Sequence, residues 1–249
     1  MSFCLNMPAI SLEELDAVAL LDRIDRKYVI PFENLNLIIS ELEKSYKVLD
    51  IDGNRIFTYK NNYFDTPDFQ FYYNHHNGYV HRIKVRSRKY VETNSSFFEI
   101  KRKEKVDRTF KLREIVPDLV ETVSPSAIQT VRDSTRKPVT ELQLTLRNNF
   151  NRITFVKFDF SERITLDFNL EFEDDENKKF IQDFFVLEIK QSKSNGRSSI
   201  TEILKKHNIR EQGFSKYVYG MISLKKNIRK NNFLPLLRTL NKPKTWRPL

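Results

Sequence analysis

Glycine is scarce in this 249-residue chain, which contains only five. They form neither a phosphate-binding loop of the Gly-x-x-x-x-Gly-Lys type nor a dinucleotide-binding Gly-x-Gly-x-x-Gly segment. Any nucleotide that the protein handles must therefore be held by side chains rather than by a glycine-rich backbone loop.

Cysteine and long apolar runs are lacking as well. The single cysteine, Cys4, excludes an internal disulfide framework and is typical of a reducing compartment. No segment approaches the ~20 apolar residues of a membrane helix, and the N-terminus lacks the basic-then-apolar layout of a secretory signal. We therefore expect a cytoplasmic protein, peripheral at a membrane only if its basic C-terminal tail meets an anionic surface.

Positive charge and aromatic residues are abundant. The formal net charge is +10, and 20 Phe and 10 Tyr contribute to a hydrophobic content of 39%, which indicates a packed globular domain rather than a disordered chain. The basic balance favours an anionic partner, which leaves nucleic acid, a membrane surface or a phosphorylated small molecule as alternatives.

Two stretches alternate between charged and apolar residues with period two, namely residues 81–90 and 97–103. As β-strands they would place Arg82, Lys84, Arg86 and Arg88 on one face. A row of like charges on a strand repels itself unless an anion lies opposite. Residues 162–172 show the cleanest alternation in the chain, which suggests a sheet face that holds a polyanion.

Capping, spacing and turn signals predict most of the elements. The expected helices are 11–21, 33–45, a short one from Ser124-Pro125, 199–207 and 214–227. The expected strands are 22–31, 48–64 with a turn at Asp52-Gly53, 79–92, 96–105, 107–116, 142–158, 162–172 and 184–191. Asp65-Thr66-Pro67-Asp68 reads as a turn and cap. Long antiparallel strands with few helices favour a β-barrel or sandwich with peripheral helices.

The simplest interpretation of the alternating charges is a solvated face. The charges are, however, in phase across several strands: the basic positions are Lys27, Arg86, Arg88, Lys101, Lys111, Arg113, Arg163 and Lys190, and the acidic ones are Glu99, Asp167, Glu171 and Glu188. In a closed barrel this face would become the lumen, where a low dielectric strengthens phosphate binding. The carboxylates would then hold Mg²⁺ or Mn²⁺, which prefer oxygen ligands.

Several short motifs together resemble one family. They are Asp25-Arg26-Lys27-Tyr28, Tyr63-Phe64-Asp65-Thr66-Pro67-Asp68, Tyr72-x-x-His75-x-x-Gly78, Arg86-x-Arg88-x-Tyr90, Glu99-x-Lys101, Arg163-Ile164-Thr165-x-Asp167, Leu187-Glu188-Ile189-Lys190 and Phe214-Ser215-Lys216-Tyr217. In number and order they resemble the polyphosphate polymerase (VTC) domain family, which belongs to the CYTH-like triphosphate tunnel metalloenzymes. The resemblance covers about residues 20–222.

The resemblance implies an α+β, mainly antiparallel fold: an eight-stranded tunnel barrel over residues 23–224, preceded by a helical segment at 1–22 and followed by a basic tail at 225–249. It implies that phosphates are gripped in the tunnel by Lys27, Arg86, Arg88, Lys101, Arg163 and Lys216, with further substrate contacts from Lys111, Arg113, Arg152, Lys190 and Tyr28. Glu188 would be the principal ligand of Mn²⁺ or Mg²⁺, with Glu99 and Asp167 as further candidates.

The implied function is polyphosphate synthesis from ATP. A triphosphatase for inorganic or organic triphosphates, and a non-catalytic module that binds polyphosphate or nucleotide, remain alternatives, whereas no specific nucleic-acid binding is expected. The segment Arg23-Ile24-Asp25-Arg26-Lys27 lacks the first carboxylate of the Glu-x-Glu-x-Lys strand of CYTH enzymes, which disfavours a two-metal site. Lys89 replaces an aromatic residue that is common in the eukaryotic domain. Any membrane coupling would need a separate membrane-protein partner.

Overall fold

The computed structural model describes residues 6–17, 23–104, 109–133, 135, 138–192 and 198–241. The chain divides into two compact units, which are described separately. Unit 1 consists of Met1–Thr58, Phe150–Leu170 and Ile181–Phe214, and unit 2 of Tyr59–Asn149, Glu171–Phe180 and Ser215–Leu249. Strands β4 (Phe57–Asp65), β8 (Gln143–Lys157) and β9 (Glu162–Glu173) contribute residues to both units.

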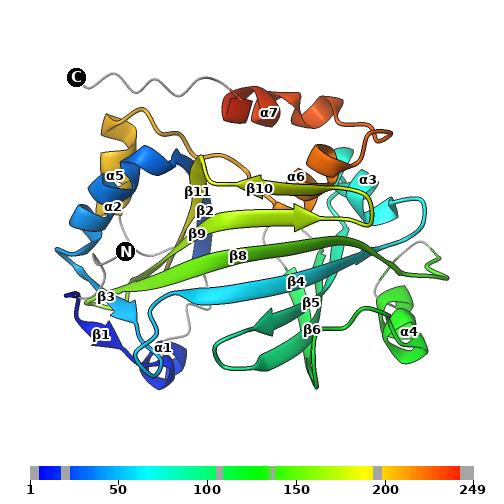
Figure 1. Cartoon of the computed structure of the whole chain (residues 1–249), viewed down its shortest axis with the longest axis horizontal. Coiled ribbons are helices and arrows are strands. Elements are labelled where there is room, and N and C mark those ends of the chain that lie inside the picture. The colour runs from blue at the N-terminus through cyan, green and yellow to red at the C-terminus, as the bar shows by residue number, and fades with distance from the viewer. Residues whose placement is uncertain are drawn as a thin grey trace. The chain divides into compact units, whose positions relative to one another are not determined.

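The sheet of unit 1 has the order β2-β11-β9-β8-β3-β1 (Figure 1). Its further strands are β2 (Arg23–Pro31), β11 (Phe184–Ser192), β3 (Tyr46–Leu49) and β1 (Ala9–Ile10). The ladders β2–β11, β11–β9 and β3–β8 are antiparallel, and β1–β3 is parallel. In the β2–β11 ladder Lys27 lies opposite Glu188, so the alternating residues Tyr28 and Leu187 point to the other face, where they join the core.

Two helices cover the apolar face of unit 1. They are α2 (Leu35–Leu42), which follows the short 3-10 turn η1 (Phe32–Asn34), and α5 (Ser199–Lys206). Figure 1 shows them side by side. The predicted apolar stripe of α2 is buried and packs with Ile200 and Leu204 of α5 against the sheet. Helix α1 (Leu12–Ala17) begins at the predicted capping box, in which Ser11 Oγ accepts from the Glu14 N–H at 3.1 Å and Glu14 accepts from the Ser11 N–H at 2.9 Å.

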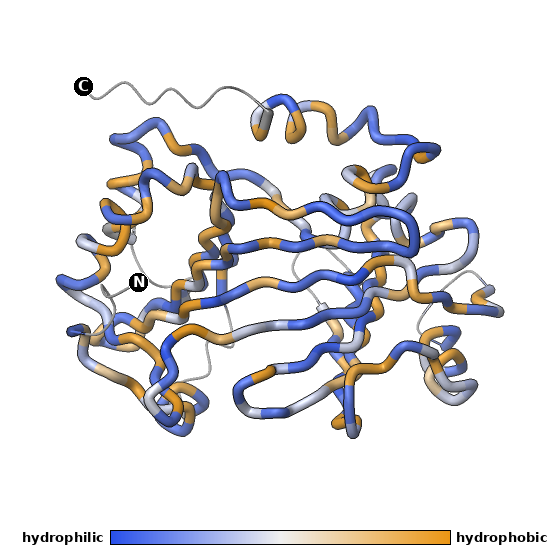
Figure 2. The backbone as a smooth tube through the Cα atoms, in the orientation of Figure 1, coloured by the Kyte–Doolittle hydropathy of each residue, from blue (hydrophilic) through white to orange (hydrophobic). Residues whose placement is uncertain are grey.

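In unit 2 the strands β4, β5 (Arg82–Tyr90), β6 (Ser95–Lys103) and β7 (Thr109–Val116) pair in sequence as antiparallel neighbours. The first part of β8 flanks β4, and β10 (Lys178–Ile181) pairs with β9. One face of β4–β6 is apolar: Phe64, Val85 and Ile100 pack with Val131 of helix α4 (Pro125–Asp133). Figure 2 shows the alternation of hydrophilic and hydrophobic residues along these strands. Polar residues therefore occupy the opposite face.

Four further helical segments belong to unit 2: α3 (Gln70–His76), α6 (Lys216–Leu224), η2 (Asn231–Phe233) and α7 (Leu234–Asn241). Asp65 caps α3, because its carboxylate accepts from the N–H groups of Phe71 at 2.8 Å and Tyr72 at 2.9 Å. The capping role predicted for this segment is confirmed. The Tyr217 hydroxyl of α6 also donates to the Asp65 carboxylate, which ties the two helices together.

The predicted strands and the five predicted helices are confirmed, with some differences in extent. The expected strand 48–64 is divided into β3 and β4, and between them Asp52 (φ 52°) and Gly53 (φ 80°) form the predicted turn. Helix α3 and strand β10 were not predicted, and helical residues 231–241 replace part of the expected tail. Residues 18–22 and 242–249 of the predicted N-terminal helix and tail lie outside the described residues.

The fold class is confirmed as α+β and mainly antiparallel. The sheet of the described residues has eleven strands rather than the expected eight: the order β2-β11-β9-β8-β4-β5-β6-β7 forms its main path, and β1, β3 and β10 lie off it. Within the described ranges the main path is open, with β2 and β7 as its end strands, so the ladders do not close into the expected ring. The described helices include none that is both apolar enough and long enough to cross a membrane.

Candidate functional site

The polar face of unit 2 carries charged residues in cross-strand register. Lys84 lies opposite Lys101, which lies opposite Lys111. In the next row Arg86 lies opposite Glu99, and Glu99 opposite Arg113. Arg88 follows, opposite Phe97. The alternation predicted from the sequence therefore brings together five of the predicted phosphate contacts: Arg86, Arg88, Lys101, Lys111 and Arg113.

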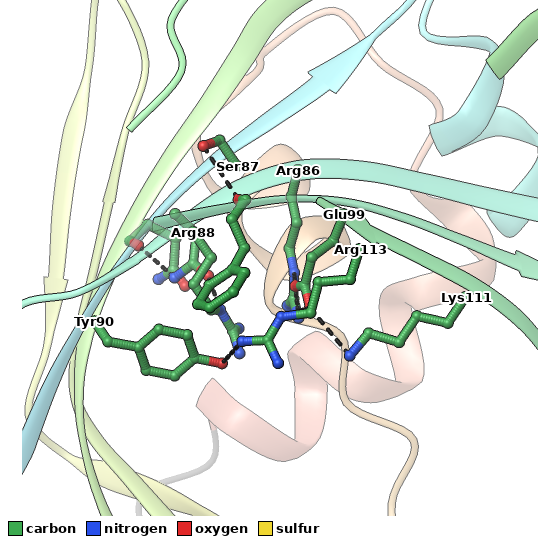
Figure 3. Close-up of polar contacts among 10 residues, drawn as sticks. Arg86, Ser87, Arg88, Tyr90, Glu99, Lys111 and Arg113 are labelled. Atoms are coloured by element: carbon green, nitrogen blue, oxygen red, sulfur yellow. Dashed lines mark hydrogen bonds and ion pairs between the residues drawn. The ribbon is translucent and has the colours of Figure 1, made fainter. Parts of the chain in front are cut away.

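Glu99 is the common counterion of this face (Figure 3). Its side chain is buried, and its carboxylate lies 2.6 Å from Arg86 Nη2, 3.2 Å from Lys111 Nζ and 3.7 Å from Arg113 Nε. Burial alone would raise the pKa of Glu99, but the charges of Arg86, Arg88 and Lys111 outweigh it and lower the pKa to about 2. Both oxygens of the carboxylate are thus engaged, Oε2 by Arg86 and Oε1 by Lys111 and Arg113, which argues against the predicted role of Glu99 as a metal ligand.

Arg88 is held in a fixed orientation. Its Nε donates to Asn61 Oδ1 at 2.7 Å, and its guanidinium lies 5.0 Å from the centre of the Tyr59 ring. The Asn61 amide in turn donates to the Asn148 carbonyl at 3.0 Å. Sequence reasoning missed Asn61, although it alternates with Tyr59 and Tyr63 on β4 and so shares their face.

The first turn of α6 lies against the same face. Lys84 Nζ donates to Ser215 Oγ at 2.9 Å, and Ser215 caps α6 by accepting from the Val218 N–H. Lys216, a predicted phosphate contact, is the first residue of that helix. The predicted motif around Lys216 is therefore attached to the strand that carries Arg86 and Arg88.

Unit 1 has its own charged face, opposite to its core. Lys27 Nζ lies 2.9 Å from Glu188 Oε1, and Arg152 makes a bidentate pair with Asp167 at 2.5 and 2.7 Å. Burial would raise the pKa of Glu188, but Lys190, Lys27 and Arg152 together hold it far below its usual range. Burial lowers the pKa of Lys190 to about 8, against the opposing effect of Glu188.

Arg163 lies opposite Lys190 in the β9–β11 register. Its side chain, however, is hydrogen-bonded to helix α1. Its Nη2 donates to the Leu15 carbonyl at 2.9 Å. Burial lowers the pKa of Arg163, and the nearby carboxylate of Asp16 opposes that shift. A phosphate that approached Arg163 would therefore compete with the C-terminal end of α1.

Tyr28 does not belong to the charged face. It is 3% exposed within the core of unit 1, and burial raises its pKa. Because Tyr28 follows Lys27 directly in a strand, the two side chains point to opposite faces. The predicted substrate contact of Tyr28 is not supported by this position.

The donor set for a divalent cation is small. The described residues include no group of three or more His, Cys, Asp or Glu side chains arranged to hold a metal ion. Arg152 already engages both oxygens of Asp167, which leaves Glu188 as the carboxylate of choice. Opposite Glu188 in the ladder, the buried Thr165 Oγ1 has no hydrogen-bond partner within the described part of the chain. One carboxylate beside an unsatisfied hydroxyl fits Mg²⁺ or Mn²⁺, because Mg²⁺ is commonly bound by one or two carboxylates together with substrate phosphates and water.

Comparison with protein families gives one decisive match. The model of the VTC domain matches residues 22–225. The chain belongs to the VTC domain family. The family resemblance inferred from the sequence motifs is thereby confirmed, and the charged faces described above lie within the matched segment.

Other comparisons are weaker. No curated protein matches. A putative adenylate cyclase from Vibrio parahaemolyticus is 13% identical, with a TM-score of 0.47 over 80% of this chain and 97% of that one. A putative adenylyl cyclase from Hippeastrum, described as having a dominant triphosphatase activity, is 16% identical, with a TM-score of 0.49 over 82% and 98%. The RNA triphosphatase of S. pombe is 10% identical, with a TM-score of 0.30 over 91% and 87%. Since these scores lie below 0.5, the assignment rests on the VTC match.

Proposed function

We propose that this VTC domain protein is a metal-dependent phosphotransferase that binds nucleoside triphosphate or polyphosphate and synthesises polyphosphate from ATP. The observation that carries the proposal is the register of cations on strand faces inside the matched domain. Rows of Lys and Arg in ladders β5–β6–β7 and β2–β11–β9 offer many phosphate contacts on rigid elements.

In unit 2, phosphate oxygens would bind to Arg86, Arg88, Lys101, Lys111, Arg113 and Lys216. The guanidinium groups give planar, bidentate contacts, and the lysines act as point charges. Glu99 keeps these cations from repelling one another before the ligand arrives, because it contacts three of them.

In unit 1, Lys27, Arg152 and Lys190 surround Glu188. A bound Mg²⁺ or Mn²⁺ would neutralise charge on the phosphate oxygens. Glu188 would hold that cation, and Lys27, already hydrogen-bonded to Glu188, fixes the orientation of the carboxylate. Phosphoryl transfer depends mainly on positioning and charge neutralisation, so these side chains suffice for it without a nucleophile or general base of their own.

The test incubates the purified protein with ATP and Mn²⁺, then measures polymer on a gel and free phosphate in solution. Polymer formation supports the proposal. Free phosphate without polymer would identify a triphosphatase, and binding without turnover would identify a binding module. Either outcome would refute the polymerase assignment.

Glu188→Gln tests the metal site. The amide keeps the volume but removes the charge that a divalent cation requires, so Mn²⁺-dependent turnover should be lost while the circular dichroism spectrum is unchanged. Glu173→Gln is the matched control, because Glu173 is also a strand carboxylate paired with a lysine, Lys178 at 3.3 Å, but lies more exposed. Turnover in Glu188→Gln equal to that of the control at limiting Mn²⁺ would show that the cation is held elsewhere.

A further inference from the structure

The charged face of unit 2 changes character along its strands. Toward one end it presents basic residues without aromatic ones: Lys84, Lys101 and Lys111 form one row, and Arg82 and Lys103 belong to the next. At the other end three aromatic residues, Tyr59, Tyr90 and Phe97, share the face with Arg88 and Arg113, as the register of the ladders shows. Lys101 and Phe97 are four residues apart on β6, which corresponds to about 13 Å along a strand.

The aromatic rings form a contiguous group. The Tyr59 and Tyr90 ring centres are 4.8 Å apart and those of Tyr90 and Phe97 are 5.7 Å apart, in edge-to-face arrangements. Arg88 lies 5.0 Å from the Tyr59 ring centre. The rings are therefore fixed by one another and by a guanidinium rather than free to reorient.

Arg113 forms the most open part of this group. Its guanidinium lies 3.6 Å from the centre of the Phe97 ring, and its Nη2 donates to the Tyr90 hydroxyl at 3.2 Å, as Figure 3 shows for the Arg113–Tyr90 contact. The Arg113 side chain is nevertheless 38% exposed, and its neighbour on the same face of β7, Ile115, is 84% exposed. A guanidinium that is stacked on a ring and still open to solvent offers a flat surface for a further planar group.

We propose that Phe97, Arg113 and Tyr90 form a nucleobase subsite, so that the ligand of this face is a nucleoside triphosphate rather than an inorganic triphosphate. The proposal rests on the proposed function, because the phosphates must lie on the lysine end of the same face. The order of side chains along the strands then matches the ligand: cations for the phosphate chain, and stacked planar groups for the base. Stacking on aromatic and guanidinium planes tolerates different bases, so the subsite recognises the presence of a base more than its identity.

The opposite face of the same ladder supplies a matched control. There Arg102 lies opposite Phe110, 5.2 Å from its ring centre, and Phe110 is also exposed. Both pairs join β6 to β7 through an arginine and a phenylalanine. They differ in that the Arg102–Phe110 pair does not share the face of the cation rows.

The experiment measures, by calorimetry at constant Mg²⁺, the affinity of β,γ-imido-ATP, which resists turnover, and of tripolyphosphate. In Phe97→Leu, affinity for the nucleotide should fall by about 5- to 100-fold, the range of one base stacked on an aromatic ring, and affinity for tripolyphosphate should change by less than twofold. Phe110→Leu should change neither. Tyr90→Leu removes another ring of the subsite and changes no residue assigned to phosphate, so it should show the same selective loss even if Phe97→Leu folds poorly.

The outcomes separate the two ideas. If Phe97→Leu and Tyr90→Leu lower the affinity for both ligands equally, or lower neither affinity, the nucleobase subsite is refuted, although the wild type still binds phosphate. Failure of the wild type to bind either ligand would refute the proposed function itself, and the subsite with it.

Discussion

Replacing Glu99 with Gln removes the carboxylate that three cations share while keeping its volume. Ionisation of this group differs between the folded and unfolded protein, since its pKa falls from 4.5 to about 2 on folding. A difference of that size corresponds to about 3 kcal/mol of stability at neutral pH. Because the Glu99 side chain is 4% exposed, solvent screens its interactions with the cations only slightly. We expect Glu99→Gln to lower the free energy of unfolding by about this amount.

The pH dependence has a definite sign. A carboxyl group whose folded pKa is depressed stabilises the fold above its unfolded pKa, and that stabilisation is lost as the pH falls toward the folded pKa. For Glu99 the window runs from pH 4.5 down to about 2. The difference in stability between wild type and Glu99→Gln should therefore be constant above this window and shrink within it. Urea unfolding at several pH values measures this difference.

The ligand response distinguishes a counterion from a metal ligand. In EDTA, tripolyphosphate should stabilise Glu99→Gln more than the wild type, because Arg86, Lys111 and Arg113 then have no competing carboxylate. Glu114→Gln is the control and should behave as the wild type, because Glu114 is exposed and lies on the opposite face of β7 from these cations. The reasoning is wrong if Glu99→Gln is as stable as the control, or if it loses its response to tripolyphosphate.

Two further substitutions test how unit 2 is packed. Gly220→Ala in α6 should destabilise the protein by about 1–3 kcal/mol, since a Cβ there would clash with a Leu146 methyl carbon and lie 2.8 Å from the Phe172 ring. A melting temperature equal to that of the wild type would show that α6 shifts freely. Tyr217→Phe removes the hydroxyl that donates to buried Asp65, so urea unfolding should show a loss of about 1–3 kcal/mol. An unchanged midpoint in urea would mean that the three N–H donors to Asp65, from Thr66, Phe71 and Tyr72, already satisfy the carboxylate.

The strands were predictable from sequence because a period of two is a strong and local signal. The residues of 82–90 and 97–103 that alternate in the sequence do share one face, and their registers align the charges. Helix α3 was missed because its cap is not adjacent to it. Asp65 caps the helix although it lies five residues before the first helical residue, Gln70. Phe69, directly before the helix, has a φ of 56°, and local sequence patterns do not predict a positive φ at a phenylalanine.

The candidate site was predictable as a set of residues but not as a set of pairs. Alternation places Glu99 and Asp167 on charged faces, but it does not indicate that Arg86 and Arg152 form ion pairs with their carboxylate oxygens. Tyr28 is a different case. Its alternation with Lys27 was visible in the sequence and places it on the core face, whereas the family motif includes both residues side by side.

The ion pairs also change the effect that removal of a basic residue should have on the stability of the protein without ligand. A row of cations on a strand would repel itself, so removing one could relieve strain. Here Arg86 pairs with Glu99, Arg152 with Asp167 and Lys27 with Glu188. Each removal therefore leaves a buried or half-buried carboxylate without its main partner. Breaking such a pair is destabilising because the remaining charge stays buried and uncompensated. A phosphate must likewise displace these carboxylates to bind, so part of its attraction to the cations is offset by the pairs that it disrupts. The same carboxylates that keep the empty faces stable therefore limit their affinity for phosphate.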